Sequence, residues 1–355
     1  MKDMKLLMFF LFCVGIFSPV NGYSQLVNTR GGIPVLDLTK DYPQMKFVVD
    51  NYESKFVLLD TTKEVADDID FKLVYASNNR IVGANRRRGD IFVFDGDGKI
   101  VSAFKFFGNG IGSTGLSVVF DEVNKEIFVA NLLPLQNNFV VFSEEGKFLR
   151  RFSLPISWIS DFYNFDEQTL LAYNQYDADA VRLFGNVDCI NSPYLLISKN
   201  DGNIVSRLNL SLSERISDSS FGNNSRIKFG QEYVFVDRSS DTTFLLVNEK
   251  LTPLFVRTPS VLEQQEIIIK VRFKTDTHLY FDAVLIENCE LADRRPIPYN
   301  PPTRNFVFDL NTGQLFSLLA ERGLPSSVVD SPEKNLVRSF STDNEQFVVE
   351  IINLE

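Results

Sequence analysis

Seven arginines stand in segments that follow short apolar runs, where a chain usually turns. Guanidinium groups bind carboxylate, sulfate and phosphate through paired hydrogen bonds, so arginines gathered on one surface would hold an anion. Such a gathering is unexpected in a chain whose net charge is −10. The alternative is a set of solvated loops in which each arginine pairs with a local acid, such as Asp90, Asp241 or Asp293. The candidate ligand-binding residues are Arg86, Arg87, Arg88, Arg182, Arg238, Arg294 and Arg295.

The residues that open these loops suggest how the loops are held. Five predicted strands lead into loops that begin with Asn85, Asn131, Asn174, Asp237 and Asn288. Asn and Asp side chains end strands by bonding to the backbone two residues on, which predicts an Asx turn at each place. If these loops are equivalent in a repeated unit, they lie on one face of the fold, and the arginines converge there.

Two cysteines, Cys189 and Cys289, lie in two long insertions, Gln175–Ser192 and Glu287–Thr303. In an exported protein two cysteines can form one disulfide. A Cys189–Cys289 bond would tie the insertions into a lid over the loop face. Two free, half-buried thiols are the alternative, and the sequence does not choose between them.

Three further patterns are weaker indications of a functional site. Gly110–Gly115 matches G-x-G-x-x-G, but the residues that follow predict a strand, whereas a dinucleotide site needs a helix. His278 is the one histidine, and no G-x-S-x-G motif accompanies it, so a catalytic triad is not predicted. Asp177, Asp179 and Asp188 lack the spacing of a calcium loop and are interpreted as solvated acids. We therefore predict no metal and no cofactor.

A repeated unit positions these residues. Arg80–Phe104 and Glu126–Phe152 share one order: an apolar strand ending in Asn, a loop, a second strand, a Gly-Lys turn and a third strand. The strands are apolar on both faces, which is typical of sheets covered on both sides. Helical periodicity is missing. The pattern predicts an all-β fold, a β-propeller of four-stranded antiparallel blades. Similar units follow at Leu170–Leu208, Tyr233–Phe255 and Leu279–Leu318.

The hairpin turns and the strand count set the number of blades. Gly98, Gly146, Gly202 and Gly313 supply the positive φ of tight hairpins, and Asn248–Lys250 is a glycine-free version. Five units begin near Phe71, Ser117, Ser157, Arg226 and Ile267, and we predict six blades because seven would be tight. The sixth blade is predicted to combine both chain ends, from Met45–Asp50, Lys55–Asp60, Asn335–Phe340 and Gln346–Asn353.

The first residues predict export. Lys2 and Lys5 precede an apolar run, Leu6–Phe17, that is short for a bilayer span. Cleavage is expected after Gly22 or Ser24, with Ser24 favoured, which gives a signal peptide over residues 1–24 and one domain over residues 25–355. An uncleaved anchor is the alternative. No later run predicts a membrane span. Phe12 before Cys13 does not fit a lipobox, so the protein is predicted not to be a lipoprotein.

The chain resembles the exported six-bladed, TolB-like propeller proteins of Bacteroidetes. The likeness rests on Ile33–Leu36, Phe94–Lys99 and Phe107–Gly112 and extends over nearly the whole chain after the signal. Many of those proteins are lipoproteins and carry a Gly-Pro-Gly-Glu-like stretch, where this chain has Ile111–Gly115. The resemblance implies a six-bladed fold and a periplasmic or secreted location. It implies no agreed activity and no catalytic residues.

Three hypotheses about function follow. The first is a non-enzymatic, extracytoplasmic binding propeller that recognises an anionic small molecule, a glycan or an envelope protein on its arginine-bearing face. The second is a carbohydrate-active hydrolase or lyase with carboxylates at the channel mouth, a mechanism that needs paired acids. The third is a structural role in an envelope complex, marked by an exposed apolar patch. The acidic balance argues against nucleic acid as a partner, and a monomer is expected.

Overall fold

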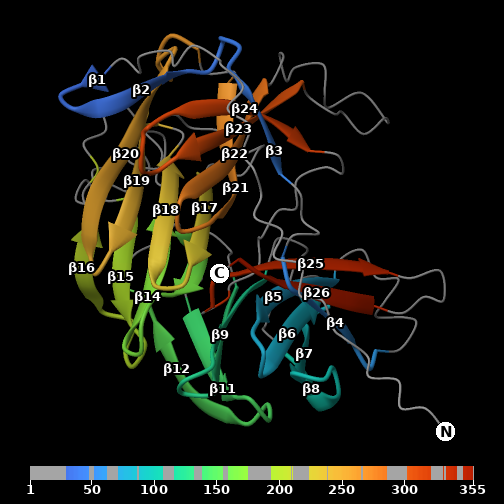
Figure 1. Cartoon of the computed structure of the whole chain (residues 1–355). Coiled ribbons are helices and arrows are strands. Elements are labelled where there is room, and N and C mark those ends of the chain that lie inside the picture. Colours follow the sequence, from blue (N-terminus) through green and yellow to red (C-terminus); the bar gives the residue numbers. More distant parts are fainter. Residues whose placement is uncertain are drawn as a thin grey trace, which may run out of the picture.

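The protein consists of strands joined by turns. The computed structural model describes residues 29–47, 52–61, 71–85, 88–106, 116–131, 138–154, 159–174, 193–208, 210, 224–237, 239–264, 267–285, 302–320, 331, 333–341 and 347–354. Within these residues there is no helix, and the strands form six sheets (Figure 1). The predicted all-β class is confirmed.

Three blades contain four antiparallel strands each, paired in chain order. Blade one is β5 (Phe71–Ala76), β6 (Arg80–Asn85), β7 (Asp90–Asp95) and β8 (Ile100–Lys105). Blade two is β9 (Leu116–Asp121), β10 (Glu126–Asn131), β11 (Asn138–Ser143) and β12 (Phe148–Ser153). Blade three is β13 (Ile159–Asn164), β14 (Thr169–Asn174), β15 (Tyr194–Ser198) and β16 (Ile204–Leu208).

The next two blades follow the same order and gain strands from the N-terminal part of the chain. Blade four is β17 (Asn224–Phe229), β18 (Glu232–Asp237), β19 (Thr242–Val247) and β20 (Lys250–Thr258). Blade five is β21 (Ile267–Lys274), β22 (His278–Leu285), β23 (Thr303–Asp309) and β24 (Leu315–Ala320). The first strands of neighbouring blades touch (β5 with β9, β9 with β13, β17 with β21), so first strands face the centre.

Apolar clusters fill the space between consecutive sheets. On β10, Ile127 and Val129 pack toward blade one, whereas Phe128 and Ala130 pack toward blade three. This division follows from the alternation of side chains along a strand. Six clusters of this kind join the blades in sequence, and one of them packs blade six onto blade one. The sheets therefore form a ring, and the prediction of a six-bladed propeller is confirmed.

Tight turns join the last two strands of each regular blade. Gly98, Gly146, Gly202 and Gly313 have φ between 71° and 86°. Asn248 and Glu249 adopt φ of 48° and 62° in the glycine-free turn. At Gly98 a Cβ would lie 2.1 Å from the carbonyl oxygen of Leu58, so this turn needs glycine for space as well as for its backbone conformation.

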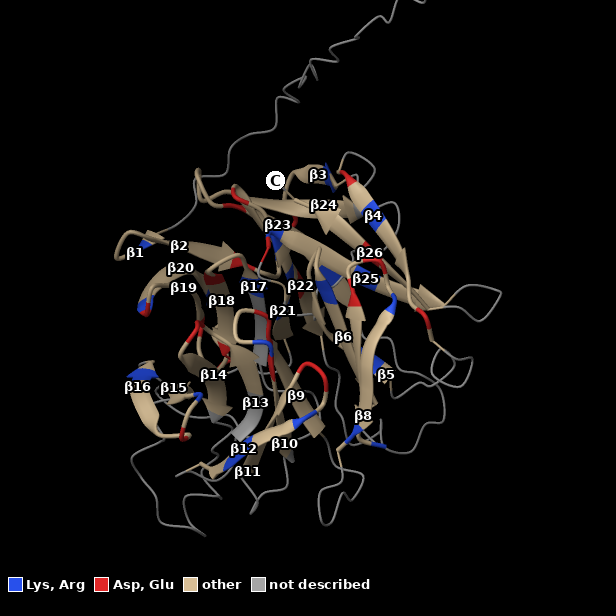
Figure 2. Cartoon of the chain, turned by 90° about the horizontal axis from the view of Figure 1, so that it is seen from below, with Lys and Arg blue, Asp and Glu red and all other residues tan. Residues whose placement is uncertain are grey.

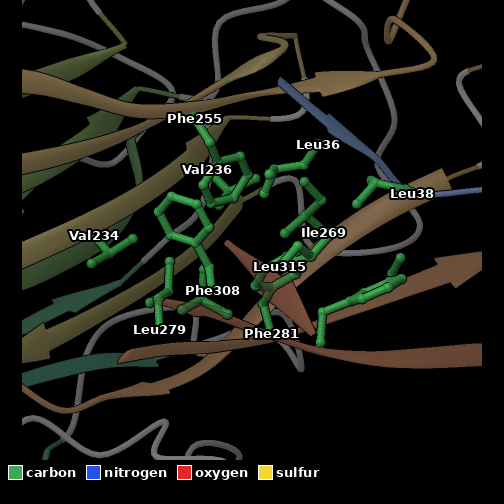
Figure 3. Close-up of a cluster of buried hydrophobic side chains, with 13 residues drawn as sticks. Leu36, Leu38, Val234, Val236, Phe255, Ile269, Leu279, Phe281, Phe308 and Leu315 are labelled. Carbon is green, nitrogen blue, oxygen red and sulfur yellow. The ribbon is translucent and has the colours of Figure 1, made fainter. Parts of the chain in front are cut away.

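Two N-terminal strands bind to the outer edges of other blades, and a third extends one of them. β1 (Thr29–Arg30) pairs with β2 (Ile33–Asp37), and β2 runs parallel to β20 with Val35 opposite Val256. β3 (Gln44–Phe47) runs parallel to β24. The blue strands β2 and β3 lie beside orange and red ones in Figure 1. Leu36 and Leu38 reach into the cluster between blades four and five (Figure 3).

The sixth sheet differs from its prediction. It contains β25 (Asn335–Ser341), β26 (Phe347–Asn353) and β4 (Ser54–Leu58), in that order, and has three strands among the described residues. The prediction placed Met45–Asp50 in this blade. That was wrong, because Met45 and Phe47 of β3 pair with β24 and fill the cluster between blades five and six. Residues 48–50 lie outside the described residues.

Charged side chains also tie neighbouring blades together. Arg80 of blade one donates from Nε to Oε2 of Glu144 of blade two at 3.0 Å. Lys125 lies 3.3 Å from the same carboxylate, which is 5% exposed. The hydrogen bond from Arg80 holds the pKa of Glu144 below its usual range, in spite of burial. Between blades two and three, Lys199 is bound by Asp121 at 2.5 Å inside the protein.

We predict that Leu36→Ala lowers the free energy of unfolding by about 2–5 kcal/mol, because it opens a cavity under β2. Leu36 is 1% exposed. Leu262→Ala is the control, since Leu262 is 48% exposed and should change the stability by no more than about 0.5 kcal/mol. Denaturant unfolding of both variants checks this. Equal stability of Leu36→Ala and the wild type would mean that β2 does not brace blades four and five.

We predict that Glu144→Gln lowers the free energy of unfolding, and that the loss is largest at neutral pH. The folded-state pKa of Glu144 lies below its unfolded value, so the carboxylate stabilises above the unfolded pKa and loses its effect as the pH falls through the folded pKa. The variant should lose about 1–3 kcal/mol at pH 7, and the difference should shrink below about pH 4. Unfolding free energies across this range test it, with exposed Glu145→Gln as the control. A difference independent of pH contradicts the assignment.

Candidate functional site

The second strands of the blades end on one edge of the propeller. β6, β10, β14 and β18 end at Asn85, Asn131, Asn174 and Asp237, as the sequence predicts. Because every regular blade runs through its strands in the same antiparallel order, these loops leave the same end of their sheets. Asn288 lies outside the described residues.

Asn85 and Asp237 anchor their loops through Asx turns. Oδ1 of Asn85 accepts a hydrogen bond from the backbone N–H of Arg88 at 2.6 Å. Oδ1 of Asp237 accepts one from Ser239 at 2.8 Å. Both side chains are buried, at 1% and 2% exposed. The predicted Asx turn is confirmed at these two loops, which begin from fixed points.

Arg88 shows the local environment of one predicted binding arginine. Its Nε lies 3.0 Å from Oδ2 of Asp90, and the side chain stays 43% exposed. Lys105, opposite Asp90 on β8, places its ammonium 3.7 Å from Oδ1. The local acid partner named from the sequence is therefore present. Two cations therefore share this carboxylate.

The remaining predicted site residues lie outside the described residues. They are Arg86, Arg87, Arg182, Arg238, Arg294, Arg295, Cys189 and Cys289. The glycine motif Gly110–Gly115 and the acids Asp177, Asp179 and Asp188 also lie outside them. Convergence of the arginines and the Cys189–Cys289 disulfide stay predictions.

Sequence reasoning missed a polar group on blade five. Asp282 of β22 is 1% exposed, and both Nε and Nη2 of Arg272 bind its Oδ2. Burial raises the pKa of Asp282, although the hydrogen bond from Arg272 acts in the opposite direction. Lys270 stands opposite Asp282 in the strand register. The interruption of the apolar strand Leu279–Leu285 by one acid was the signal that could have revealed this group.

The described titratable residues include further paired groups. His278 begins β22, and its Nδ1 lies 2.7 Å from Oγ1 of Thr277.

Basic and acidic segments alternate over the described strands, with no large region of one sign (Figure 2). In the described part of the chain, no three His, Cys, Asp or Glu side chains are placed to share a metal ion. No described segment is a helix able to cross a membrane.

Comparisons with known proteins agree with the fold. A family model, DUF5128, described as a 6-bladed beta-propeller, matches residues 28–255. A protein of Bacteroides fragilis that is thought to be exported has a similar structure, with a TM-score of 0.58, 12% identity and 90% of this chain and 99% of that chain covered. A DUF4221 member from Bacteroides vulgatus has a TM-score of 0.51 and 12% identity, with 85% of this chain and 97% of that chain covered. At these identities the likeness shows the fold alone. No curated protein matches the sequence.

We predict that Asn85→Ala loosens the first of these loops. The variant leaves the N–H of Arg88 without its acceptor at a buried site, so the free energy of unfolding should fall by about 1–3 kcal/mol. Asn79→Ala is the control, because Asn79 is exposed in the turn at the other end of the same sheet. Denaturant unfolding measures both. An unchanged midpoint for Asn85→Ala would show that the Asx turn does not hold this loop.

Proposed function

Because the chain belongs to the DUF5128 family of six-bladed β-propellers, we propose that it is an exported, non-enzymatic binding protein for anions. The ligand is a carboxylated, sulfated or phosphorylated molecule, such as an acidic glycan. It binds on the edge formed by the loops between second and third strands, where Arg86, Arg87, Arg88, Arg182, Arg238, Arg294 and Arg295 stand in the sequence.

The local charge around Arg88 carries this proposal. Asp90 accepts from Arg88 and lies near Lys105, so one carboxylate faces two cations. The sequence adds Arg86 and Arg87 directly before Arg88. Guanidinium groups offer a carboxylate, sulfate or phosphate paired hydrogen bonds, so three consecutive arginines supply the donors that an anionic ligand needs.

The scaffold supports binding on this edge. Loops held by buried Asn85 and Asp237 start from fixed positions, which lowers the entropy lost when a ligand orders them. Loops on a rigid scaffold are the usual place for binding residues. The apolar run Leu6–Phe17 and the export expected of the Bacteroides fragilis neighbour support a location outside the cytoplasm.

The test is a thermal-shift titration of the purified protein with glucuronate, a sulfated sugar and inorganic phosphate. A ligand at a hundred times its Kd should stabilise the protein by about 2.7 kcal/mol. We expect a shift with at least one anion, weaker at high salt, and its loss in the double variant Arg87→Ala plus Arg295→Ala. Arg151→Ala, at an exposed arginine of β12, should keep the shift.

Two results would overturn the proposal. One is no shift with any anion, which would favour a protein partner for this face. The other is an equal shift in the double variant and in Arg151→Ala, which would place the binding elsewhere on the molecule.

A further inference from the structure

The outer strands of blades one, two and three carry exposed apolar side chains at equivalent positions. Val101 of β8, Leu149 of β12 and Val205 of β16 are each the third residue after the glycine of the preceding turn. They are 40%, 42% and 60% exposed. The equivalent residue of blade five, Phe316, is partly buried, and there β3 lies beside the outer strand. Apolar side chains gathered on a surface are typical of a place where another molecule binds.

The three outer strands follow one another around the ring. A Cβ on Gly146, in the turn before β12, would lie 2.6 Å from the ring of Phe104 on β8. A Cβ on Gly202, in the turn before β16, would lie 2.6 Å from the ring of Phe152 on β12. Each turn therefore packs against the outer strand of the preceding blade. The exposed residues belong to one connected surface, the apolar rim, which consists of Val101, Leu149 and Val205.

The outer edges of other blades show what such an edge binds. In the described part of the chain, β8, β12 and β16 stand last in their sheets, whereas β20 and β24 are followed by β2 and β3. Both added strands run parallel to the strand that they join. An outer edge of this ring thus accepts an extended segment, added in parallel. Addition of a strand to a sheet edge is also a common way to recognise a peptide.

The charge of the outer strands selects the segment that fits. β8, β12 and β16 contain no Asp or Glu, although the net charge of the chain is −10. Their bases, drawn blue in Figure 2, are Lys105, Arg150, Arg151 and Arg207. Lys105 and Arg150 face carboxylates of their own blades. Arg151 and Arg207 are exposed, and each stands two residues after an apolar residue of the rim, on the same side of its strand.

Two other occupants fit these strands less well. A second copy of the chain, joined through the same edges, would bring arginine against arginine, and like charges on paired strands are destabilising. A lipid bilayer is flat, whereas the three strands stand on successive blades of a ring, so a bilayer would touch only part of the rim. A segment with an acidic residue two positions from an apolar one satisfies both the apolar and the basic side chains.

We propose that the apolar rim binds an extended segment of a partner protein, in which apolar and acidic residues alternate on one face. The segment adds in parallel to the outer edge of β12. Its apolar side chain packs on Leu149 and its carboxylate pairs with Arg151. Val205 and Arg207 of β16 offer the same pair of contacts. Outer strands form this surface, not the arginine-bearing loops, so the proposal does not depend on the function proposed for those loops. Small anions lack the strand contacts and are not held here.

Fluorescence anisotropy with a labelled synthetic peptide tests the proposal on the purified protein. The probe repeats Val-Thr-Glu-Thr, which places valine and glutamate alternately on one face of a strand. We expect saturable binding that weakens at high salt. A peptide that repeats Val-Thr-Lys-Thr should bind much more weakly, because its charge is reversed. A peptide that repeats Val-Pro-Glu-Thr should also bind weakly, because proline removes the backbone N–H groups that a strand needs.

Exposed positions on β12 give the matching variants. Leu149→Ser plus Arg151→Glu should raise the Kd of the probe about tenfold, since it removes the apolar contact and reverses the charge. The unfolding midpoint should stay unchanged, because both side chains are exposed. Val123→Ser is the control. Val123 is 68% exposed in the turn between β9 and β10, away from the outer strands, and its loss should leave the Kd unchanged.

Several results would overturn the proposal. The first is no saturable binding of the glutamate peptide, and the second is equal binding by the double variant and the wild type. Equal binding of the proline peptide would show that no strand is added. A dimer in light scattering that Leu149→Ser dissociates would assign the rim to a second copy. Binding to phosphatidylglycerol vesicles that the double variant loses, without binding of the peptide, would assign it to a membrane.

Discussion

Every sheet in this protein must be covered on both faces, and the cover comes from the neighbouring sheets. A four-stranded sheet of Val, Ile, Leu and Phe has two apolar surfaces, and exposing either of them to water is unfavourable in free energy. Closing the sheets into a ring covers all of them. At one such interface, phenyl rings from three strands meet. The ring centroid of Phe139 lies 4.4 Å from that of Phe162 and 5.3 Å from that of Phe152. Many of the phenylalanine side chains pack in these interfaces.

The same requirement applies to blade six, which is built from both parts of the chain. Blade six packs on blade one through residues such as Val337 and Val349, and on blade five through Leu336, Ile352 and Leu354. The next rows carry Arg338, Glu350 and exposed Phe56. One face of this blade therefore carries charged side chains in the rows next to its apolar contacts.

Local signals made the fold predictable. Gly98 and its equivalents fix hairpins, and Asn85 or Asp237 ends a strand through a bond within its own turn, so a short stretch of sequence carries the information. The position of β3 could not be predicted in this way. Met45 pairs with Leu318, far along the chain, and the register is set by where Phe47 fits among Phe273 and Tyr280. For the site, residue type identified Arg88, and nearby Asp90 gave its partner. The contact of Arg272 with Asp282 could be recognised only once the register of β21 and β22 was known.

The pairings of β2, β3 and β4 have a consequence for the order in which the protein folds. Val35 finds its partner at Val256, Met45 at Leu318 and Val57 at Val349. All three strands are synthesised long before the strands that receive them. Blades one to three can form from consecutive residues. In contrast, β2, β3 and β4 stay unpaired, with apolar residues such as Leu36 unburied, until the strands that receive them have been made. Contacts so distant in sequence slow folding, because a large loop must close before they are made. The nascent chain therefore spends its synthesis with its beginning unpaired, and the ring becomes complete only after its last strands have been made.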